Sequence, residues 1–124
     1  CLAVGAGVKH DTTTINNKRN TSSHIKNIQF VNEDAGDFLV CYAEGGRADV
    51  VIMDPPRSGS TPEFLQSLLQ IKPKRIVYIS CNPETQVRDV RVLQKGGYKV
   101  EACEGYDMFP HTFHIENVVL MTLK

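Results

Sequence analysis

The stretch Asp49-Val-Val-Ile-Met-Asp54-Pro-Pro-Arg57-Ser-Gly59 decides the fold of this 124-residue chain. Residues 49–53 lack polar alternation, which is typical of a strand that is buried on both faces in a parallel sheet. Asp54 follows at once, and the two prolines and Gly59 favour a stiff turn that a ligand can approach closely. The sequence therefore predicts a buried strand with a rigidly held carboxylate at its end.

A second strand, residues 76–79, is predicted between two helices. Thr61 and Asn82 cap the helices before and after this strand, and each cap is followed by a proline, which is favoured at the first helical position. Gly96-Gly97 ends the second helix. Strand and helix therefore alternate along this part of the chain.

The flanking segments extend the same pattern. Residues 25–32 are predicted as a strand and residues 35–44 as a short helix. Residues 98–106 and 115–124 are predicted as two closing strands, which pair antiparallel because their connection is short. The expected fold class is α/β, a Rossmann-like, mostly parallel sheet with an antiparallel closing strand.

Composition limits the classes of function. Lysine plus arginine and aspartate plus glutamate number 14 each, so the basic footprint of an autonomous nucleic-acid binder is absent. The four cysteines form no Cys-x-x-Cys pair, which argues against a zinc site and a disulfide framework and favours a reducing, cytoplasmic setting. No apolar run approaches the ~18 residues of a membrane span. We expect residues 1–124 to form a single domain.

Three chemically capable side chains directly follow predicted strands: Asp34, Asp54 and Cys81. In doubly wound sheets ligands bind outside the carboxyl ends of the strands, so these side chains could face one crevice. Cys81 also precedes a predicted helix N-terminus, which favours a thiolate. Simpler interpretations stay open, because Asp54 suits an ordinary turn and a free cysteine is often a small buried hydrophobe.

Three motifs in order carry a resemblance to a known family. They are Asp54-Pro-Pro-Arg-Ser-Gly, Ser80-Cys-Asn-Pro-Glu-Thr85 and Asp107-Met-Phe-Pro-His-Thr-Phe-His-Ile-Glu116. Together they resemble the RNA uracil C5 methyltransferases, which form 5-methyluridine in tRNA or rRNA. Residues 25–35 are also similar to the third strand of that family and its acidic tip. The resemblance implies a Rossmann-like fold that uses S-adenosylmethionine.

The resemblance also implies a role for four residues. The Cys81 thiolate would add to C6 of a uracil in the RNA, so that C5 accepts the methyl group of S-adenosylmethionine. Glu116 would then remove the C5 proton as a general base. Asp34 would lie near the adenine end of the cofactor, and Asp54 near its methionine end or the target base. A uridine in folded RNA would have to be flipped out to reach Cys81.

The first 25 residues depart from the family pattern. Val4-Gly5-Ala6-Gly7 offers a lone Gly-x-Gly, and residues 7–25 are too few for a helix, a second strand and another helix. If residues 2–8 are instead the second strand, the ribose-binding acid of the family falls near Lys9, whose charge is wrong. We therefore expect a catalytic domain that is incomplete at its N-terminus, weak or inactive in isolation, and able to form a homodimer through sheet edges beside a missing strand.

Other interpretations stay open. The chain could be a truncated or degenerate, catalytically silent module, or a hydrolase in which Cys81 acts with His111 or His114. The hydrolase leaves the Asp54 motif unexplained. Arg57 is compatible with a phosphate or base contact and equally with a structural hydrogen bond.

Overall fold

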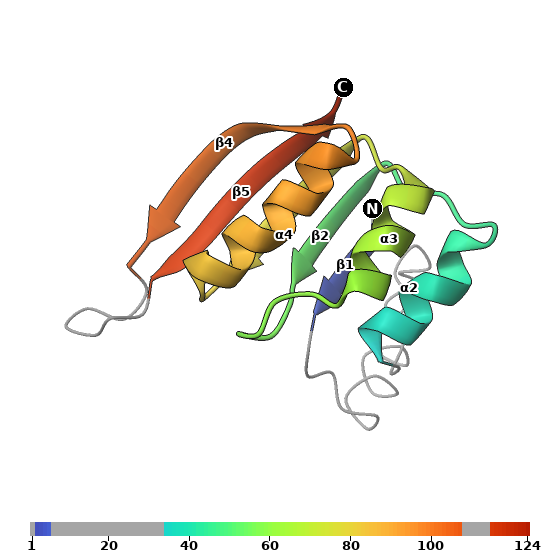
Figure 1. The fold of residues 1–124 in the computed structure, drawn as a ribbon, viewed down its shortest axis with the longest axis horizontal. Helices are drawn as coiled ribbons and strands as arrows, with labels where there is room; N and C mark the ends of the chain where they lie inside the picture. The colour runs from blue at the N-terminus through green and yellow to red at the C-terminus, as the bar shows by residue number, and fades with distance from the viewer. Residues whose placement is uncertain (1, 6–33, 108–114) are drawn as a thin grey trace, which may run out of the picture.

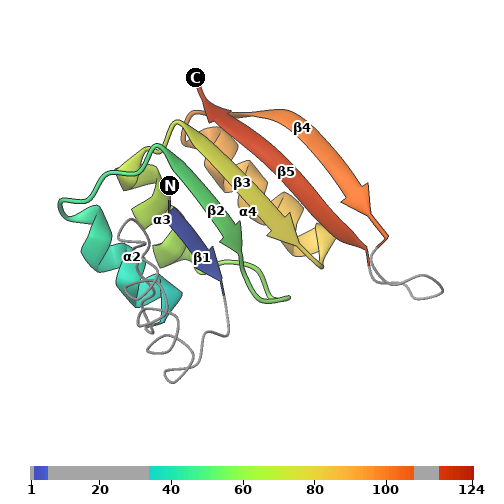
Figure 2. The same ribbon diagram turned by 180° about the vertical axis from the view of Figure 1, so that it is seen from behind.

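The computed structural model describes residues 2–5, 34–107 and 115–124 (Figure 1). Five strands form one sheet of order β1-β2-β3-β5-β4, namely β1 (Leu2–Gly5), β2 (Val50–Asp54), β3 (Arg75–Ser80), β4 (Tyr98–Tyr106) and β5 (Glu116–Leu123). Three helices accompany it, namely α2 (Ala35–Ala43), α3 (Pro62–Ile71) and α4 (Pro83–Lys95). Figures 1 and 2 show α3 and α4 on one face of the sheet, with α2 beside α3.

Strand directions in the described sheet agree with the predicted class. β1, β2 and β3 run parallel, and β5 runs against both β3 and β4. The prediction of two antiparallel closing strands is confirmed. The position of β5 between β3 and β4 was not predicted, and it makes two of the four described pairings antiparallel.

The core lies between the sheet and helices α3 and α4. Val51 and Met53 of β2 are buried, whereas Val50 and Ile52, on the other face of the same strand, are only half-buried. The prediction that this strand is buried on both faces is therefore wrong for the described residues, because the described helices cover one face. The largest fully buried side chains on the covered side include Tyr78, Leu68, Leu93 and Met121.

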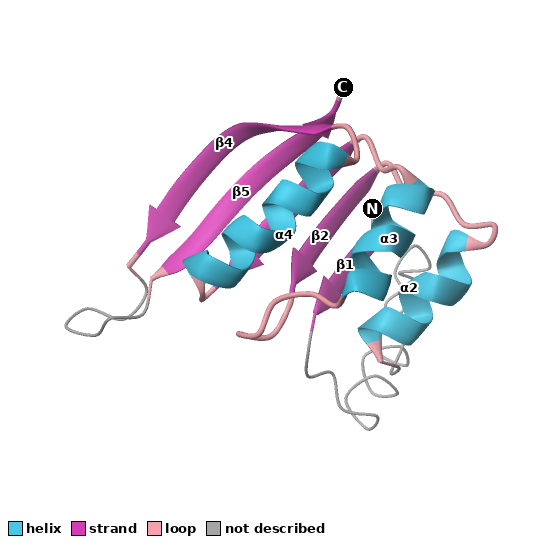
Figure 3. Ribbon diagram, in the orientation of Figure 1, coloured by secondary structure: helices cyan, strands magenta, loops and turns pink. Residues whose placement is uncertain are grey.

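Local sequence explains where the helices begin. Thr61 Oγ1 accepts a hydrogen bond from Phe64 N at 3.2 Å, and Asn82 Oδ1 accepts one from Glu84 N at 3.1 Å. Both predicted caps are confirmed, as is the helix after Asp34. Figure 3 shows that α3 begins near the carboxyl end of β2, and Figure 2 shows that α4 begins near the carboxyl end of β3. None of the helices described here has the length and apolar composition that crossing a membrane requires.

Several predictions concern residues outside the described part of the chain. They are the strand at residues 25–32, the second glycine of the Gly-x-Gly at position 7, the strand missing between residues 7 and 25, and the two histidines of the loop at 108–114.

Candidate active site

Strand register brings two predicted catalytic residues to the same end of the sheet. Ser80, the last residue of β3, pairs with Asn117 of β5. This is the last pair of the β3–β5 ladder, and the chain leaves β3 after it. Cys81 directly follows Ser80, and Glu116 directly precedes Asn117. Because the two strands are antiparallel, the predicted nucleophile and the predicted base both flank this pair at the carboxyl end of β3.

The predicted cofactor residue Asp54 lies at the same edge of the sheet. It ends β2, which is parallel to β3 and next to it, and its partner in β1 is Gly5. Met53 points toward the helices, so the alternation of the strand places Asp54 on the opposite face, where its side chain is exposed. Glu116 alternates in the same way with Asn117, which bonds to α4. The two carboxylates thus project from the same face.

Asp34 has a structural role in addition to any binding role. Its Oδ1 accepts hydrogen bonds from Gly36 N at 2.9 Å and Asp37 N at 3.1 Å, which caps α2. A Cβ on Gly36 would lie 4.0 Å from Thr61 Oγ1, so the N-terminus of α2 lies beside that of α3. The exposed Asp34 carboxylate is therefore at the helix N-termini near the end of β2, with Oδ1 already engaged.

The first two sequence motifs are joined by hydrogen bonds. The carbonyl oxygen of Arg57 accepts from Asn82 Nδ2 at 3.2 Å and from Thr85 Oγ1 at 3.1 Å. The turn itself closes through a bond of 2.9 Å from Gly59 N to Pro56 O. The loop after Asp54 is therefore attached to the helix start that follows Cys81, and the two motifs form one structural unit.

A buried carboxylate completes this attachment. Asp89 of α4 is fully buried, and its Oδ2 accepts from Ser60 N and from the Tyr78 hydroxyl, each at 2.7 Å. Its Oδ1 accepts from Arg88 Nε at 3.0 Å and Nη2 at 2.9 Å. Burial, and then the hydrogen bond to Asp89, raise the pKa of Tyr78 well above its usual value. The tyrosine hydroxyl therefore stays a donor to the carboxylate.

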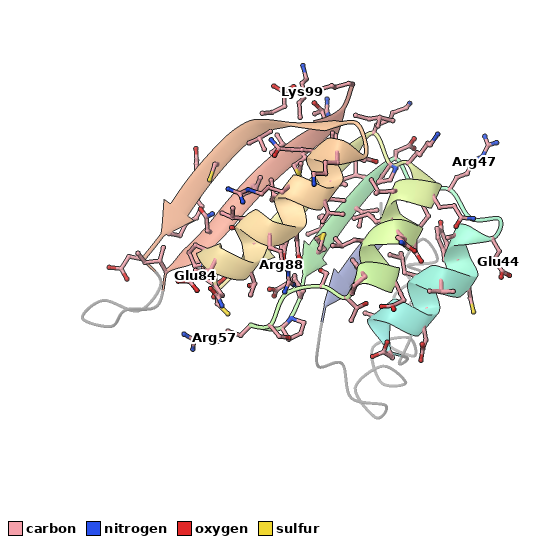
Figure 4. All side chains as sticks on the ribbon, in the orientation of Figure 1. Glu44, Arg47, Arg57, Glu84, Arg88 and Lys99 are labelled. Atoms are coloured by element: carbon pink, nitrogen blue, oxygen red, sulfur yellow. The ribbon has the colours of Figure 1, made fainter. Side chains whose placement is uncertain are left out.

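Arg88 also reaches the loop directly. Its Nη2 donates to Ser58 O at 3.1 Å and to Ser60 O at 3.3 Å. Figure 4 shows Arg88 against the loop, whereas the exposed Arg57 side chain extends away from the protein. Among the described residues Arg57 contributes its backbone oxygen to the loop, and a bond from its guanidinium to a backbone carbonyl, the structural alternative, is not found there.

A second polar cluster supports the strand that carries Glu116. Gln86 Nε2 donates to Tyr78 O at 3.0 Å and to Asn117 O at 3.1 Å. Asn117 Nδ2 donates back to Gln86 Oε1 at 2.6 Å. Gln86 is buried, so it fixes the junction of β3 and β5 directly beside the Cys81 and Glu116 positions.

Sequence reasoning missed Asp89, Arg88 and Gln86. A signal was present, because Gln86, Asp89 and Leu93 recur at spacings of three and four, which places them on one helical face. Gln86, Asp89 and Leu93 are all buried. Polar residues on the buried face of a helix require partners, and these partners lie in segments distant in sequence.

The arrangement favours covalent chemistry by a thiol next to a carboxylate. Cys81 is a free, partly exposed cysteine, and so is accessible to a substrate. Exposed carboxylates at the same edge suit a cationic or hydroxyl-bearing ligand. The free cysteines among the described residues also include Cys41 and Cys103, which lie in α2 and β4.

Comparison with known proteins identifies relatives along most of the chain. Residues 39–124 match the family described as tRNA (Uracil-5-)-methyltransferase. The chain is 48% identical over 96 residues to an uncharacterized RNA methyltransferase of Thermotoga maritima, a match that covers 77% of this chain and 21% of the relative. It is 47% identical over 109 residues to an uncharacterized RNA methyltransferase of Halalkalibacterium halodurans, covering 86% of this chain and 24% of the relative.

A solved structure shares both the fold and part of the sequence. It is the tRNA (uracil-54, C5)-methyltransferase of Pyrococcus abyssi in complex with S-adenosyl-L-homocysteine, with a TM-score of 0.69 and 29% identity. The match covers 97% of this chain and 28% of that protein. The chain thus spans about a quarter of the length of the relatives it matches.

Proposed function

Because the chain belongs to the tRNA (uracil-5-)-methyltransferase family, we propose that it forms the catalytic part of an enzyme that makes 5-methyluridine in tRNA or rRNA. The observation that supports this proposal is the register of β3 and β5, because its last pair, Ser80 with Asn117, is flanked by Cys81 and Glu116 at the end of the sheet where Asp54 ends β2. A nucleophile, a base and a cofactor carboxylate are the three groups that the reaction needs.

In the proposed mechanism Cys81 forms a bond to C6 of the uracil, and the electron pair of the C5–C6 double bond moves toward O4. When bound, S-adenosylmethionine would supply an electrophilic methyl group for C5 and would leave as S-adenosyl-L-homocysteine when its S–CH3 bond breaks. Glu116 then accepts the C5 proton, and the C6–S bond breaks to return the Cys81 thiolate and 5-methyluridine. The flanking positions of Cys81 and Glu116 suit steps at neighbouring carbons of one ring.

Asp54 and Asp34 are the residues proposed to hold the cofactor. The exposed Asp54 carboxylate, on a loop fixed by α4, suits the positively charged methionine end or the target base. Asp34 suits the adenine end, with Oδ2 as the available oxygen because Oδ1 caps α2. Each residue offers a carboxylate oxygen as an acceptor, which fits the amino and hydroxyl groups of this cofactor.

The short span of the chain relative to its relatives supports a partial catalytic domain over residues 1–124. We expect the chain alone to bind S-adenosylmethionine weakly and to methylate RNA weakly or not at all. A silent, degenerate module is the alternative. We also expect homodimers through a sheet edge; size-exclusion chromatography with light scattering would oppose this if the chain stayed monomeric at high concentration.

Covalent trapping tests the function. RNA containing 5-fluorouridine should form a stable adduct with the complete protein that carries this chain, because fluorine blocks removal of the C5 proton. Cys81→Ala should abolish the adduct, whereas Cys103→Ala, which removes another free and exposed thiol, should retain it. An adduct that survives Cys81→Ala would refute the mechanism.

Calorimetric titration of S-adenosylmethionine tests the cofactor site separately. Asp54→Ala should weaken binding, whereas Asp37→Ala, at an exposed carboxylate in the first turn of α2, should not. Equal affinities in wild type and Asp54→Ala would remove Asp54 from the site. No binding by the complete protein would favour the silent module.

A further inference from the structure

The loop from Asp54 to Ser60 is held mainly from one side, by the first half of α4. Four side chains of that helix and its cap make the contacts, and every one reaches a backbone atom of the loop: Asn82, Thr85, Arg88 and Asp89. Asn82 directly follows Cys81, so the same segment carries the nucleophile and fixes the loop. These bonds therefore add to the pairing of β2 with β3 and fix the turn that follows Asp54 to the segment that carries Cys81.

Asp89 carries the deepest part of this attachment. A buried carboxylate is costly unless it is paired and hydrogen-bonded, and here both oxygens have partners. One partner is the backbone N–H of Ser60 at the end of the loop, and another is the Tyr78 hydroxyl from β3. The carboxylate thus ties the loop to the strand whose end bears Cys81.

Arg88 supplies the charge that balances this carboxylate and closes the turn. Residues one apart on a helix do not face each other, so Arg88 must fold back to reach Asp89 Oδ1 at 2.9 Å. In that position its Nη2 meets the carbonyls of Ser58 and Ser60. The side chain remains half-exposed, so its conformation is set by these contacts rather than by close packing.

We propose that Arg88 and Asp89 are positioning residues for methyl transfer, which act through the Ser58–Ser60 backbone to hold Asp54 in place relative to Cys81. This inference rests on the proposed function, because it assigns Asp54 to the cofactor or the target base. Neither residue touches the reacting atoms. Their loss displaces the loop and leaves Cys81 and Glu116 in their strand register.

The test uses Arg88→Lys and Asp89→Asn in the complete protein. Lysine keeps the positive charge but lacks the planar guanidinium, which donates hydrogen bonds to Asp89 and to two loop carbonyls at the same time. Asparagine keeps the shape but removes the negative charge. We expect kcat/KM for S-adenosylmethionine to fall on the order of tenfold in each, since small misplacement of a reacting group is costly. Trapping of 5-fluorouridine RNA by Cys81 should be slowed by a similar factor, because the adduct becomes irreversible only once the methyl group has been transferred to C5.

Two controls separate positioning from stability. Arg91→Lys changes an exposed arginine of the same helix, and Tyr98→Phe removes a buried hydroxyl that bonds to Pro73 O at 2.7 Å, away from the loop. Both should leave kcat/KM unchanged, even if Tyr98→Phe lowers the melting temperature as much as Asp89→Asn. If Asp89→Asn fails to fold, Arg88→Lys at its half-exposed site still gives the result.

The outcomes distinguish this inference from the proposed function. A wild-type protein that methylates RNA, with Arg88→Lys and Asp89→Asn equally active at matched folded fraction, overturns the positioning role and leaves the function intact. A wild-type protein that neither binds the cofactor nor traps RNA overturns the function and with it the positioning role. Hydrogen exchange at Ser60 N checks the mechanism: it should accelerate in both variants and stay unchanged in Arg91→Lys.

Discussion

Replacing Gly59 by alanine should destabilise the protein through the contact between the loop and α4. Gly59 has φ of +82°, in the left-handed region that side chains disfavour. A Cβ at this position would lie 2.5 Å from Arg88 Nη2, 3.0 Å from Asp89 Oδ2 and 3.1 Å from Thr85 Cβ. The first of these atoms ends a flexible side chain, so we expect Arg88 to move and release its loop contacts.

The size of the effect follows from two contributions. The left-handed conformation costs alanine about 1–2 kcal/mol relative to glycine. Loss of the Arg88 bonds to Ser58 O and Ser60 O costs about 1–2 kcal/mol more, taken near the lower end for charged donors because the side chain is half-exposed. Gly59→Ala should therefore lower the free energy of unfolding by about 2–4 kcal/mol.

Urea unfolding of the 124-residue chain measures this loss, with Gly45→Ala as the matched control. A Cβ at Gly45 would meet nothing within 4 Å, and that residue does not adopt positive φ, so its replacement should change stability by less than about 0.5 kcal/mol. In an Arg88→Ala background, Gly59→Ala should cost only the backbone contribution of about 1–2 kcal/mol. A Gly59→Ala loss below about 1 kcal/mol, or one independent of Arg88, would refute the reasoning.

Three further predictions follow from individual contacts. Asp34→Ala should lower the free energy of unfolding by about 1 kcal/mol, because the α2 cap is lost. Asp34→Asn keeps the cap, so its free energy of unfolding should stay within about 0.3 kcal/mol of wild type. If urea unfolding shows an equal loss in both variants, the cap is not the cause. Burial raises the pKa of Tyr98 from 10.0 to about 12, so between these pH values the folded chain binds more protons than the unfolded chain and stability must fall as pH rises. Unfolding measured across this range should show a shallower fall in Tyr98→Phe than in wild type, and identical slopes would contradict the assignment. Asn82→Ala removes both the α4 cap and a hydrogen bond to Arg57 O, whereas Thr61→Ala removes only the cap of α3. Asn82→Ala should therefore lower the free energy of unfolding more than Thr61→Ala does. If Thr61→Ala has the lower denaturant midpoint, the bond from Asn82 to the loop does not contribute to stability.

The helix starts were predictable because their causes are local. A capping side chain followed by proline marks the beginning of α3 and α4, and both signals lie within three residues. The positions of Asp54 and Cys81 at the carboxyl ends of two strands were predictable for the same reason, since an acid and a thiol follow apolar strands. Short-range signals in the amino-acid sequence are enough to predict these positions.

The parts that could not be predicted depend on distant segments. The short connection indicates that β4 and β5 pair, but not that β5 inserts beside β3, which depends on the free edge that β3 offers. That insertion is what brings the start of β5, with Glu116, beside the carboxyl end of β3. Asp89 and Gln86 look like ordinary polar residues of a helix, and only the folded chain supplies Ser60 N, Tyr78 and Asn117 as their partners.

The contacts that α4 and its cap make with the loop depend on the backbone conformation of the loop and not on its side chains. These bonds end on the carbonyl oxygens of residues 57, 58 and 60 and on the amide of residue 60, which every non-proline residue possesses. The outward side chains at Arg57 and Ser58 are thus decoupled from the scaffold that supports them. Libraries randomised at these two positions should therefore retain the loop conformation, so the surface chemistry beside Asp54 can be changed without changing the scaffold.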